Sequence, residues 1–485
     1  MATKTVQAVT EHVEAPLGPS NMDGSCESQK MPDPSLTDEA TQRAMRRLVR
    51  KIDMRLLPIM CITYGLQYYD KVILGHAAVY GLIQDLGLDI EASRYSNASM
   101  IFYCGYLLGA FPISYLAQMF PTGKVCAVLV VVWSAIVLST AGCTTYEGLL
   151  VNRLVVSMWY TKREQLLRSG LWYSFSGGSN LIVPVISFGI GHIKTKTPSS
   201  WQWMFIIAGG ITFLWSVVIV LFFPDSPLSA KGFTDEERGL IQERMKADNA
   251  GSLDRHFKLP HVLECLKSVN FWTVNLMAML TSVVSGPISS FGPLIFSDMG
   301  FTKEQSLLLN MPNGVMAFIC ILTSATLGRK IPNIRLILIV CGCLLAVVGC
   351  CVSWRLPTEN NVGRLSGFYM MNFFSSAYIQ VIGLGTCNVG GYTKKATSSA
   401  GIFVFYCLGS IMGPQIFNRK DAPRYDPGFM GTMICLASCS VLAVLLRLHL
   451  ARKNSKREVE NGPAGTEHGL DDVTDVENKD FRYQL

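Results

Sequence analysis

The chain has 485 residues, of which 49% are hydrophobic and 16% are charged, whereas a soluble chain of this size would carry about 25% charged residues. Its apolar residues gather in runs long enough to cross about 30 Å of hydrocarbon, which indicates a polytopic membrane protein and excludes a soluble globular one. The net charge of +7 comes from basic residues beside these runs, so it indicates orientation in a lipid bilayer rather than nucleic-acid binding.

Three polar segments frame two apolar blocks, and all three are expected in the cytosol. Residues 1–50 are rich in Pro, Ser, Asp and Glu, so we expect a disordered N-terminal tail that buries too little apolar surface to fold. Residues 224–270 are expected to form a central loop, and residues 451–485 a C-terminal tail. In the loop, Thr234 and Glu237 have the spacing of a capping box, which predicts the start of a short helix.

The apolar runs predict membrane-spanning helices. Five runs precede the central loop and six follow it, at residues 56–82, 95–119, 123–142, 170–191, 203–223, 271–296, 306–327, 335–353, 364–388, 397–417 and 428–450. Basic clusters such as "TGK", "TKREQLLR" and "TKK" lie between runs, and basic loops stay on the cytosolic side of a membrane. Two of these clusters, at Lys124 and Lys162, therefore require a return crossing between them, which is predicted at residues 149–158.

This fourth crossing is too short for its task. Residues 149–158 amount to about 15 Å of helix, whereas the hydrocarbon is about 30 Å thick. That deficit is too large for snorkelling of flanking residues or bilayer thinning to absorb comfortably. Two readings stay open: the sequence is a gene model or splice form that lacks part of an exon, or a strained or re-entrant fourth segment exists.

Six crossings, a loop and six more crossings predict an all-α fold of two helix bundles, at residues 51–223 and 271–450, with a truncated fourth helix. In such a layout each bundle is built from inverted three-helix repeats, and the substrate site lies near the midplane between the bundles. Both ends of the chain then lie in the cytosol.

Three stretches carry a resemblance to a known family. The first span contains "LQYYDKVILGHAAVYGL", a later stretch reads "NVGGYTKKATSSAGIFVFYCLGSIMGPQIFNRKDAPRYDPG", and the tail ends in "DFRYQL". These motifs resemble the fungal allantoate permease family, the anion:cation symporters of the major facilitator superfamily. The resemblance implies proton-coupled uptake of a small carboxylated solute such as allantoate, nicotinate or pantothenate, by a monomer in the plasma membrane.

The sequence departs from the family pattern at two places. Gln118 stands where the superfamily loop after the second helix usually carries an acidic residue. Between Val156 and Ser157, about 15 residues that family members usually have are absent, which agrees with the short fourth crossing. The function that the resemblance implies is therefore the function of a family member whose fourth helix is complete.

Candidate functional residues are polar groups within the spans, because burying a charge in hydrocarbon is costly. No catalytic motif or metal-ligand spacing is present, so we predict neither an enzyme nor a cofactor or metal site. Asp70 and Lys71 stand near the middle of the first span. Asp70 is predicted to take up the coupling proton and Lys71 to bind the substrate carboxylate. An internal ion pair, or a position open to water, is the alternative.

Arg153 is the charged residue of the short fourth segment and is predicted to bind the substrate carboxylate, with an interfacial arginine as the alternative. Further candidate substrate contacts are aromatic rings that could stack on a planar solute and amides that could bond to it: Tyr69, Trp172, Asn180, Asn372 and Gln380. Packing between helices is their alternative role.

Two other functions stay open at this point. One is export of a fungal secondary metabolite, for which the same architecture would serve. The other is a non-transporting variant or a nutrient sensor, because the fourth helix is incomplete.

Overall fold

The computed structural model describes residues 34–88, 93–158, 169–193, 195, 197–223, 233–235, 237–240, 258–357, 359–417, 419–462 and 473–485. The chain divides after Arg50 into two units, and each is described by itself. In the first unit, residues 34–50 are helical and form the beginning of α1 (Pro34–Ala77). Residues 34–50 were predicted to be disordered together with residues 1–33, but Ala, Gln, Arg, Met and Leu in this stretch favour a helix.

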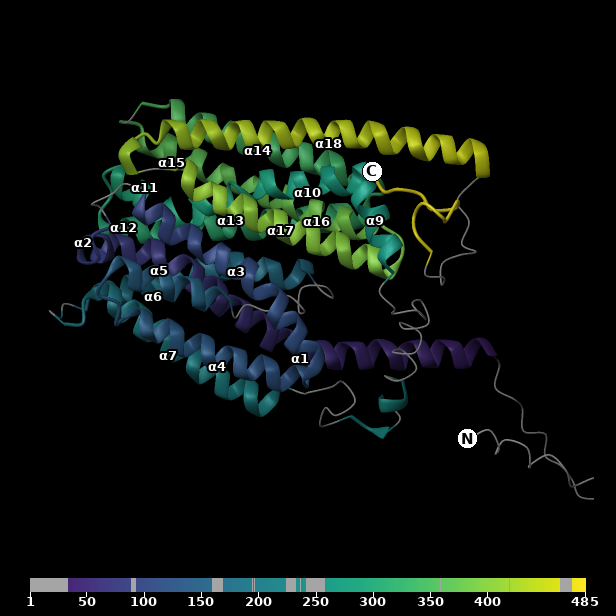
Figure 1. Cartoon of the computed structure of the whole chain (residues 1–485), viewed down its shortest axis with the longest axis horizontal. Coiled ribbons are helices and arrows are strands. Elements are labelled where there is room, and N and C mark those ends of the chain that lie inside the picture. The colour runs from purple at the N-terminus through teal and green to yellow at the C-terminus, as the bar shows by residue number, and fades with distance from the viewer. Residues whose placement is uncertain are drawn as a thin grey trace, which may run out of the picture. The chain divides into compact units, whose positions relative to one another are not determined.

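The first half of the larger unit is a bundle of helices that coincide with the first six predicted spans. Beyond α1 they are η1 (Ala78–Leu82), α2 (Ile83–Asp85), α3 (Arg94–Met119), α4 (Thr122–Thr140), α5 (Tyr146–Met158), α6 (Ser169–Gly191) and α7 (Ser200–Phe222). η1 is a wider, π-helical turn that interrupts the first span. Within this bundle α3 packs against α5, and α4 against α7 (Figure 1).

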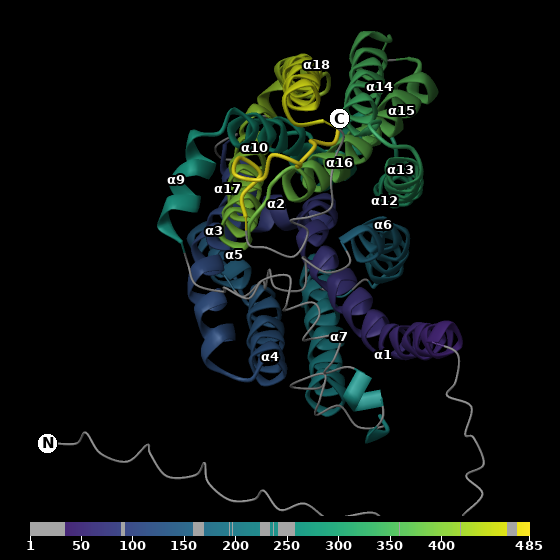
Figure 2. The ribbon, with the colours of Figure 1, turned by 90° about the vertical axis from the view of Figure 1, so that its right-hand side faces the viewer.

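The second half is a bundle that coincides with the last six predicted spans. Its elements are α9 (Leu259–Lys267), α10 (Val269–Ser282), η3 (Pro287–Phe291), α11 (Gly292–Asp298), α12 (Lys303–Leu308), α13 (Met311–Lys330), α14 (Arg335–Arg355), α15 (Asn361–Met370), η4 (Met371–Phe373), α16 (Phe374–Cys387), α17 (Tyr392–Ile416), η5 (Arg419–Asp421) and α18 (Asp426–Asn461). Figure 2 looks along the helices: α17 lies next to α3 and α5, whereas α14, α15 and α18 lie away from α4 and α7. The predicted all-α fold is confirmed, since every regular element in the described ranges is helical.

The helices have the character of membrane spans. Six of the described helices are long and apolar enough to cross a bilayer. Large apolar side chains point outward from α7, where Leu214, Leu221 and Phe222 are 68%, 71% and 69% exposed. Such an apolar exterior is unfavourable in water and favourable in lipid. The predicted capping box in the central segment is also confirmed, because the Glu237 backbone N–H donates to Thr234 Oγ1 at 3.3 Å.

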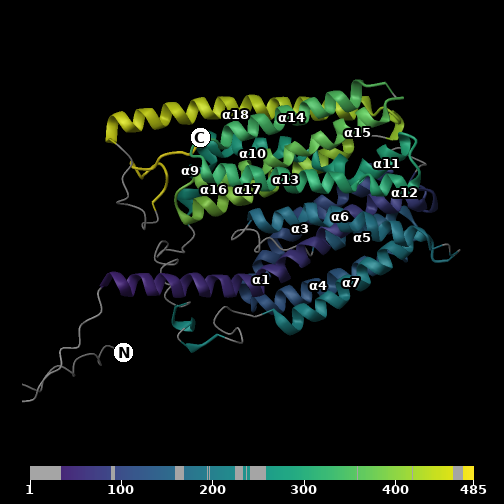
Figure 3. The ribbon, with the colours of Figure 1, turned by 180° about the vertical axis from the view of Figure 1, so that it is seen from behind.

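The two bundles meet where α6 crosses α13 and where α3 crosses α17; Figure 3 shows the same helices from behind. A Cβ atom on Gly177 of α6 would lie 2.7 Å from the carbonyl oxygen of Gly314 on α13. Only glycine at both positions lets these backbones approach so closely. At another crossing, the Tyr95 hydroxyl of α3 donates to the Ser290 carbonyl oxygen at 2.6 Å.

The fourth crossing is short in the structure as in the sequence. α5 has 13 residues, which gives about 20 Å of helix, and residues 159–168 lie outside the described ranges. Its end packs closely against α3, because a Cβ atom on Gly105 or Gly109 would overlap the α5 backbone. The small residues of α3 thus position the short helix, and with it the buried side chain of Arg153, against the first helix.

Candidate functional site

A small cavity lies beside the middle of α1. It is lined by side chains of α1, α3, α5 and η3, namely Lys71, Leu74, Ala98, Ser99, Phe102, Tyr103, Arg153 and Ser290. Two of the predicted site residues, Lys71 and Arg153, therefore face the same space. Because one wall comes from η3, the cavity has contributions from both bundles.

Lys71 reaches from the first bundle toward the second. Its Nζ atom lies 5.6 Å from the ring centroid of Tyr68 and 5.5 Å from that of Tyr103. It also donates to Ser285 Oγ, at 3.4 Å, on the segment that joins α10 to η3. Within the described residues Lys71 makes no ion pair with a carboxylate, so aromatic faces and one hydroxyl replace a counter-ion.

Arg153 and Asp70 lie next to each other. Arg153 is 2% exposed, and its Nη1 donates to the backbone oxygen of Asp70 at 3.3 Å. Its guanidinium carbon lies 5.9 Å from the ring of Phe102, while Nε and Nη2 have no hydrogen-bond partner among the described residues. The Asp70 side chain is 4% exposed and accepts a long bond, 3.5 Å, from Trp133 Nε1. The first bundle thus buries the guanidinium of Arg153 against the backbone of Asp70, whose own side chain is also buried.

The other candidates of the first bundle are Asn180, Tyr69 and Trp172. Asn180 of α6 donates from Nδ2 to the Tyr68 hydroxyl at 2.9 Å, and thereby braces one of the two rings beneath Lys71. Tyr69 is 3% exposed, and its hydroxyl has no hydrogen-bond partner among the described residues. Trp172 lies in α6, but its side chain falls outside what the structure describes.

Two candidates lie away from the cavity, in the second bundle. Asn372 donates to Asn313 Oδ1 at 2.7 Å, and Asn313 donates in turn to Asn310 Oδ1 at 2.8 Å. Gln380 donates from Nε2 to the Ser324 carbonyl oxygen at 2.7 Å. Neither Asn372 nor Gln380 lines the cavity, and each joins two helices of the same bundle. These contacts match the packing role that was the alternative for them.

No sequence pattern indicates two residues that the structure places in the lining of this cavity. Tyr103 and Ser290 sit within apolar runs, and nothing in their sequence context says which way their side chains point. His76 is fully buried, with Nδ1 2.8 Å from Ser187 Oγ and with no partner for Nε2 among the described residues. A charge inside an apolar run is a visible signal, whereas a hydroxyl or a neutral ring is not. In the described ranges, no cluster of His, Cys, Asp or Glu is placed to hold a metal ion.

The sequence of this chain matches a family model and two yeast transporters. Residues 60–414 match the family model of the Major Facilitator Superfamily. An uncharacterised transporter of Schizosaccharomyces pombe is 32% identical over 467 residues, which cover 92% of this chain and 87% of that protein. The allantoate permease of Saccharomyces cerevisiae is 29% identical over 491 residues, which cover 95% of this chain and 90% of that protein.

Solved structures agree at the level of the fold. The crystal structure of a D-xylose-proton symporter has a TM-score of 0.58 at 13% identity, covering 81% of this chain and 96% of the symporter chain. A bacterial homologue of the human lysosomal transporter Spinster, in an inward-facing and occupied conformation, has a TM-score of 0.56 at 13% identity, covering 81% and 95%.

Proposed function

Because the chain belongs to the major facilitator superfamily, and is a secondary transporter rather than an enzyme, we propose that it couples proton entry to the uptake of a small carboxylated solute. Allantoate, nicotinate and pantothenate are solutes of this class. Within the superfamily, we assign the chain to the allantoate permease family. The identity to the yeast allantoate permease along nearly the whole chain supports this assignment.

The observation that carries the proposal is the pair of cations on one cavity. Lys71 and Arg153 both line it, and two guanidinium nitrogens of Arg153 have no hydrogen-bond partner among the described residues. A buried N–H group without an acceptor is costly, and a bound carboxylate would supply acceptors for the two guanidinium nitrogens. An organic anion therefore fits this cavity better than a neutral sugar does.

Asp70 is the proposed proton-coupling residue. Entry of one negative charge against a membrane potential of about 100 mV costs about 2.3 kcal/mol, so uptake of an anion needs at least one accompanying proton. Asp70 is buried and touches Arg153 through its backbone oxygen. Protonation of this carboxylate would leave the positive charge of Arg153 available to the substrate, which links the two binding events.

The remaining assignments follow the family design. The carrier acts as a monomer in the plasma membrane with both termini in the cytosol. Its bundles comprise residues 51–223 and 271–450, joined by a cytosolic loop at residues 224–270 and followed by a cytosolic tail from residue 451. Tyr69, Trp172, Asn180, Asn372 and Gln380 stay predicted substrate contacts, and the hydrogen bonds of the last two favour a packing role instead.

A second candidate function rests on the short fourth helix. With 13 residues, α5 is about 10 Å short of the hydrocarbon thickness, which favours a carrier that binds solute without moving it. Export of a metabolite is a third possibility within the same fold.

One experiment separates these functions. Purified protein in proteoliposomes is given labelled allantoate, nicotinate or pantothenate, with an inward or an outward proton gradient. We expect accumulation that depends on acid outside and that collapses with a protonophore. Accumulation driven by the opposite gradient would indicate export, and saturable binding without accumulation or exchange would indicate the non-transporting variant.

A further inference from the structure

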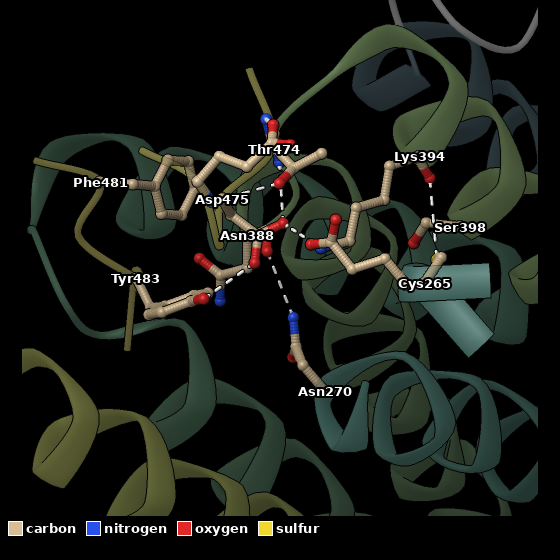
Figure 4. A network of polar contacts seen from close by, with 12 residues as sticks. Cys265, Asn270, Asn388, Lys394, Ser398, Thr474, Asp475, Phe481 and Tyr483 are labelled. Atoms are coloured by element: carbon tan, nitrogen blue, oxygen red, sulfur yellow. Dashed lines mark hydrogen bonds and ion pairs between the residues drawn. The ribbon is translucent and has the colours of Figure 1, made fainter. Parts of the chain in front are cut away.

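The cytosolic end of the second bundle holds a buried lysine between two carboxylates. Lys394, in the first turn of α17, is 2% exposed, and its Nζ lies 2.6 Å from Asp475 Oδ1 and 2.7 Å from Glu264 Oε1. Glu264 belongs to α9, and Asp475 belongs to residues 473–485, which we call the strap. One ammonium group thus joins three separate parts of the chain (Figure 4).

The strap is fixed at a second point by its own tyrosine. The Tyr483 hydroxyl donates to Asp475 Oδ2 at 2.8 Å and accepts from Lys453 Nζ at 2.8 Å. The backbone of Tyr483 forms a reciprocal pair with Asn454, at 2.7 and 2.9 Å. Both Lys453 and Asn454 lie on the extension of α18, so the strap runs along this helix.

A third attachment joins the strap to the ends of α14 and α16. Asn388 forms another reciprocal pair with the backbone of Gln484, at 2.7 and 2.9 Å, and the Arg335 N–H donates to the Leu485 carbonyl oxygen at 3.0 Å. A Cβ atom on Gly390 would lie 2.6 Å from the backbone nitrogen of Asp475. The loop before α17 therefore accommodates the strap because glycine stands at this position.

These contacts are those of a built binding site. Asparagine side chains both donate to and accept from backbone groups of the strap, so the site selects the direction in which the peptide runs. The buried lysine pairs with the one buried carboxylate of the strap, so the site also selects its side chains. Every partner described for the strap lies between residues 333 and 462, so it fastens helices of one bundle to each other. Within the described residues it does not fasten one bundle to the other.

We propose that the cytosolic end of the second bundle is a peptide-binding site whose ligand is the strap, and that docking makes α14, α16, α17 and α18 move as one body. The ligand is a peptide with a carboxylate and a tyrosine eight residues apart, as Asp475 and Tyr483 are. When the strap is released, Lys394 keeps Glu264 as its partner but loses Asp475. The end of α17 and the loop before it then move independently of α18.

The test uses a protein truncated after Gly462 and a synthetic peptide of residues 473–485 carrying a fluorophore. We expect saturable one-to-one binding to the truncated protein and none to the full chain, whose site is occupied. A peptide with Asp475→Asn should bind at least about tenfold more weakly. A peptide with Asp480→Asn is the matched control and should bind like the parent peptide, because the described contacts of Asp480 run through its backbone nitrogen. Equal loss with both peptides, or equal binding to both proteins, would overturn the proposal.

A second measurement keeps the proposal testable if the truncated protein does not fold. In the full chain, hydrogen exchange should show protected amides at Gly390, Tyr483 and Gln484. Asp475→Asn should raise exchange there and at the start of α17, while α3 to α7 stay unchanged, and Asp480→Asn should alter neither. Rapid exchange of the strap amides in the parent chain, or an equal rise in both bundles, would contradict the proposal. Neither readout requires a substrate, so the outcome is independent of the transport activity proposed above.

Discussion

Asn180 donates a hydrogen bond of 2.9 Å to the hydroxyl of Tyr68, and the ring of Tyr68 lies 5.6 Å from the ammonium group of Lys71. The hydroxyl and the ring of Tyr68 therefore have different roles. The hydroxyl fixes the orientation of the ring, and the ring face stabilises the cation.

The first prediction follows from this separation. Tyr68→Phe keeps the ring and should change the apparent KM for uptake by less than about threefold, whereas Tyr68→Leu removes the ring face. That loss amounts to about 0.5–2 kcal/mol, which should raise KM by about 2- to 30-fold. Initial uptake rates at a series of substrate concentrations measure the difference. Similar KM values for the two variants would mean that the ring does not stabilise Lys71.

A second prediction concerns coupling. Asp70→Asn, in a version with an intact fourth helix, should abolish accumulation of labelled solute while exchange across the membrane partly persists, because the carrier still moves but no longer binds the proton. Lys71→Ala should instead weaken apparent affinity. Glu147→Gln is the matched control for the lost carboxylate, since Glu147 is exposed at the start of α5. If Asp70→Asn accumulates solute as steeply as the parent and with the same pH dependence, the coupling site lies elsewhere.

A third prediction uses the contact between bundles. Gly314→Ala would place a methyl group 2.5 Å from the Gly177 carbonyl oxygen, and Gly178→Ala would meet nothing within 4 Å. We expect Gly314→Ala to cost about 1–3 kcal/mol of stability through overpacking. Gly178→Ala should be neutral or slightly stabilising, because alanine favours a helix over glycine. Thermal unfolding in detergent compares the pair, and equal Tm values would show that α6 and α13 are not held so closely.

The fourth prediction tests the short helix. Inserting about 15 residues of family-like sequence between Val156 and Ser157 should raise the amount of protein at the cell surface, because the crossing would then match the bilayer. Topology reporters placed after Lys162, which lies outside the described residues, and after Lys395 follow the same question. If both report the cytosol in the parent chain, the short segment already crosses the membrane.

A fifth prediction concerns pH and the strap. Burial, and then the negative charge of Asp475, raise the pKa of the Tyr483 hydroxyl above its usual value of about 10. A raised pKa means that docking favours the protonated form, so this contribution is present below about pH 10 and is lost as the pH rises further. Binding of the peptide of residues 473–485 to the truncated protein should therefore weaken above about pH 10. A Tyr483→Phe peptide should bind more weakly throughout, without that additional fall; an equal fall in both would assign the effect to Lys453.

Part of this molecule can be predicted from sequence because some signals are local. Apolar runs locate the spans, and a charge such as Asp70, Lys71 or Arg153 inside a run is conspicuous. The role of Gln380 cannot be predicted in this way. Its hydrogen bond to Ser324 depends on a residue distant in the chain, and in the sequence Gln380 resembles any other amide in the middle of a span. Lys394 illustrates the same limit, since its basic cluster indicated orientation while its partner Asp475 lies in a segment expected to be a plain tail. The roles of Gln380 and Lys394 depend on which residues lie next to them in the folded protein, and hydropathy does not reveal these neighbours.

The strap also bears on how the two halves of the chain depend on each other. In the described residues, every residue that contacts the strap comes after residues 241–257 in the sequence, as the strap does. What joins the halves in the described residues is surface contact, as between Gly177 and Gly314 or between Lys71 and Ser285. A break in the polypeptide within the central segment would therefore sever none of these attachments. The two halves of the carrier are therefore held together by noncovalent contacts, as the subunits of a heterodimer are.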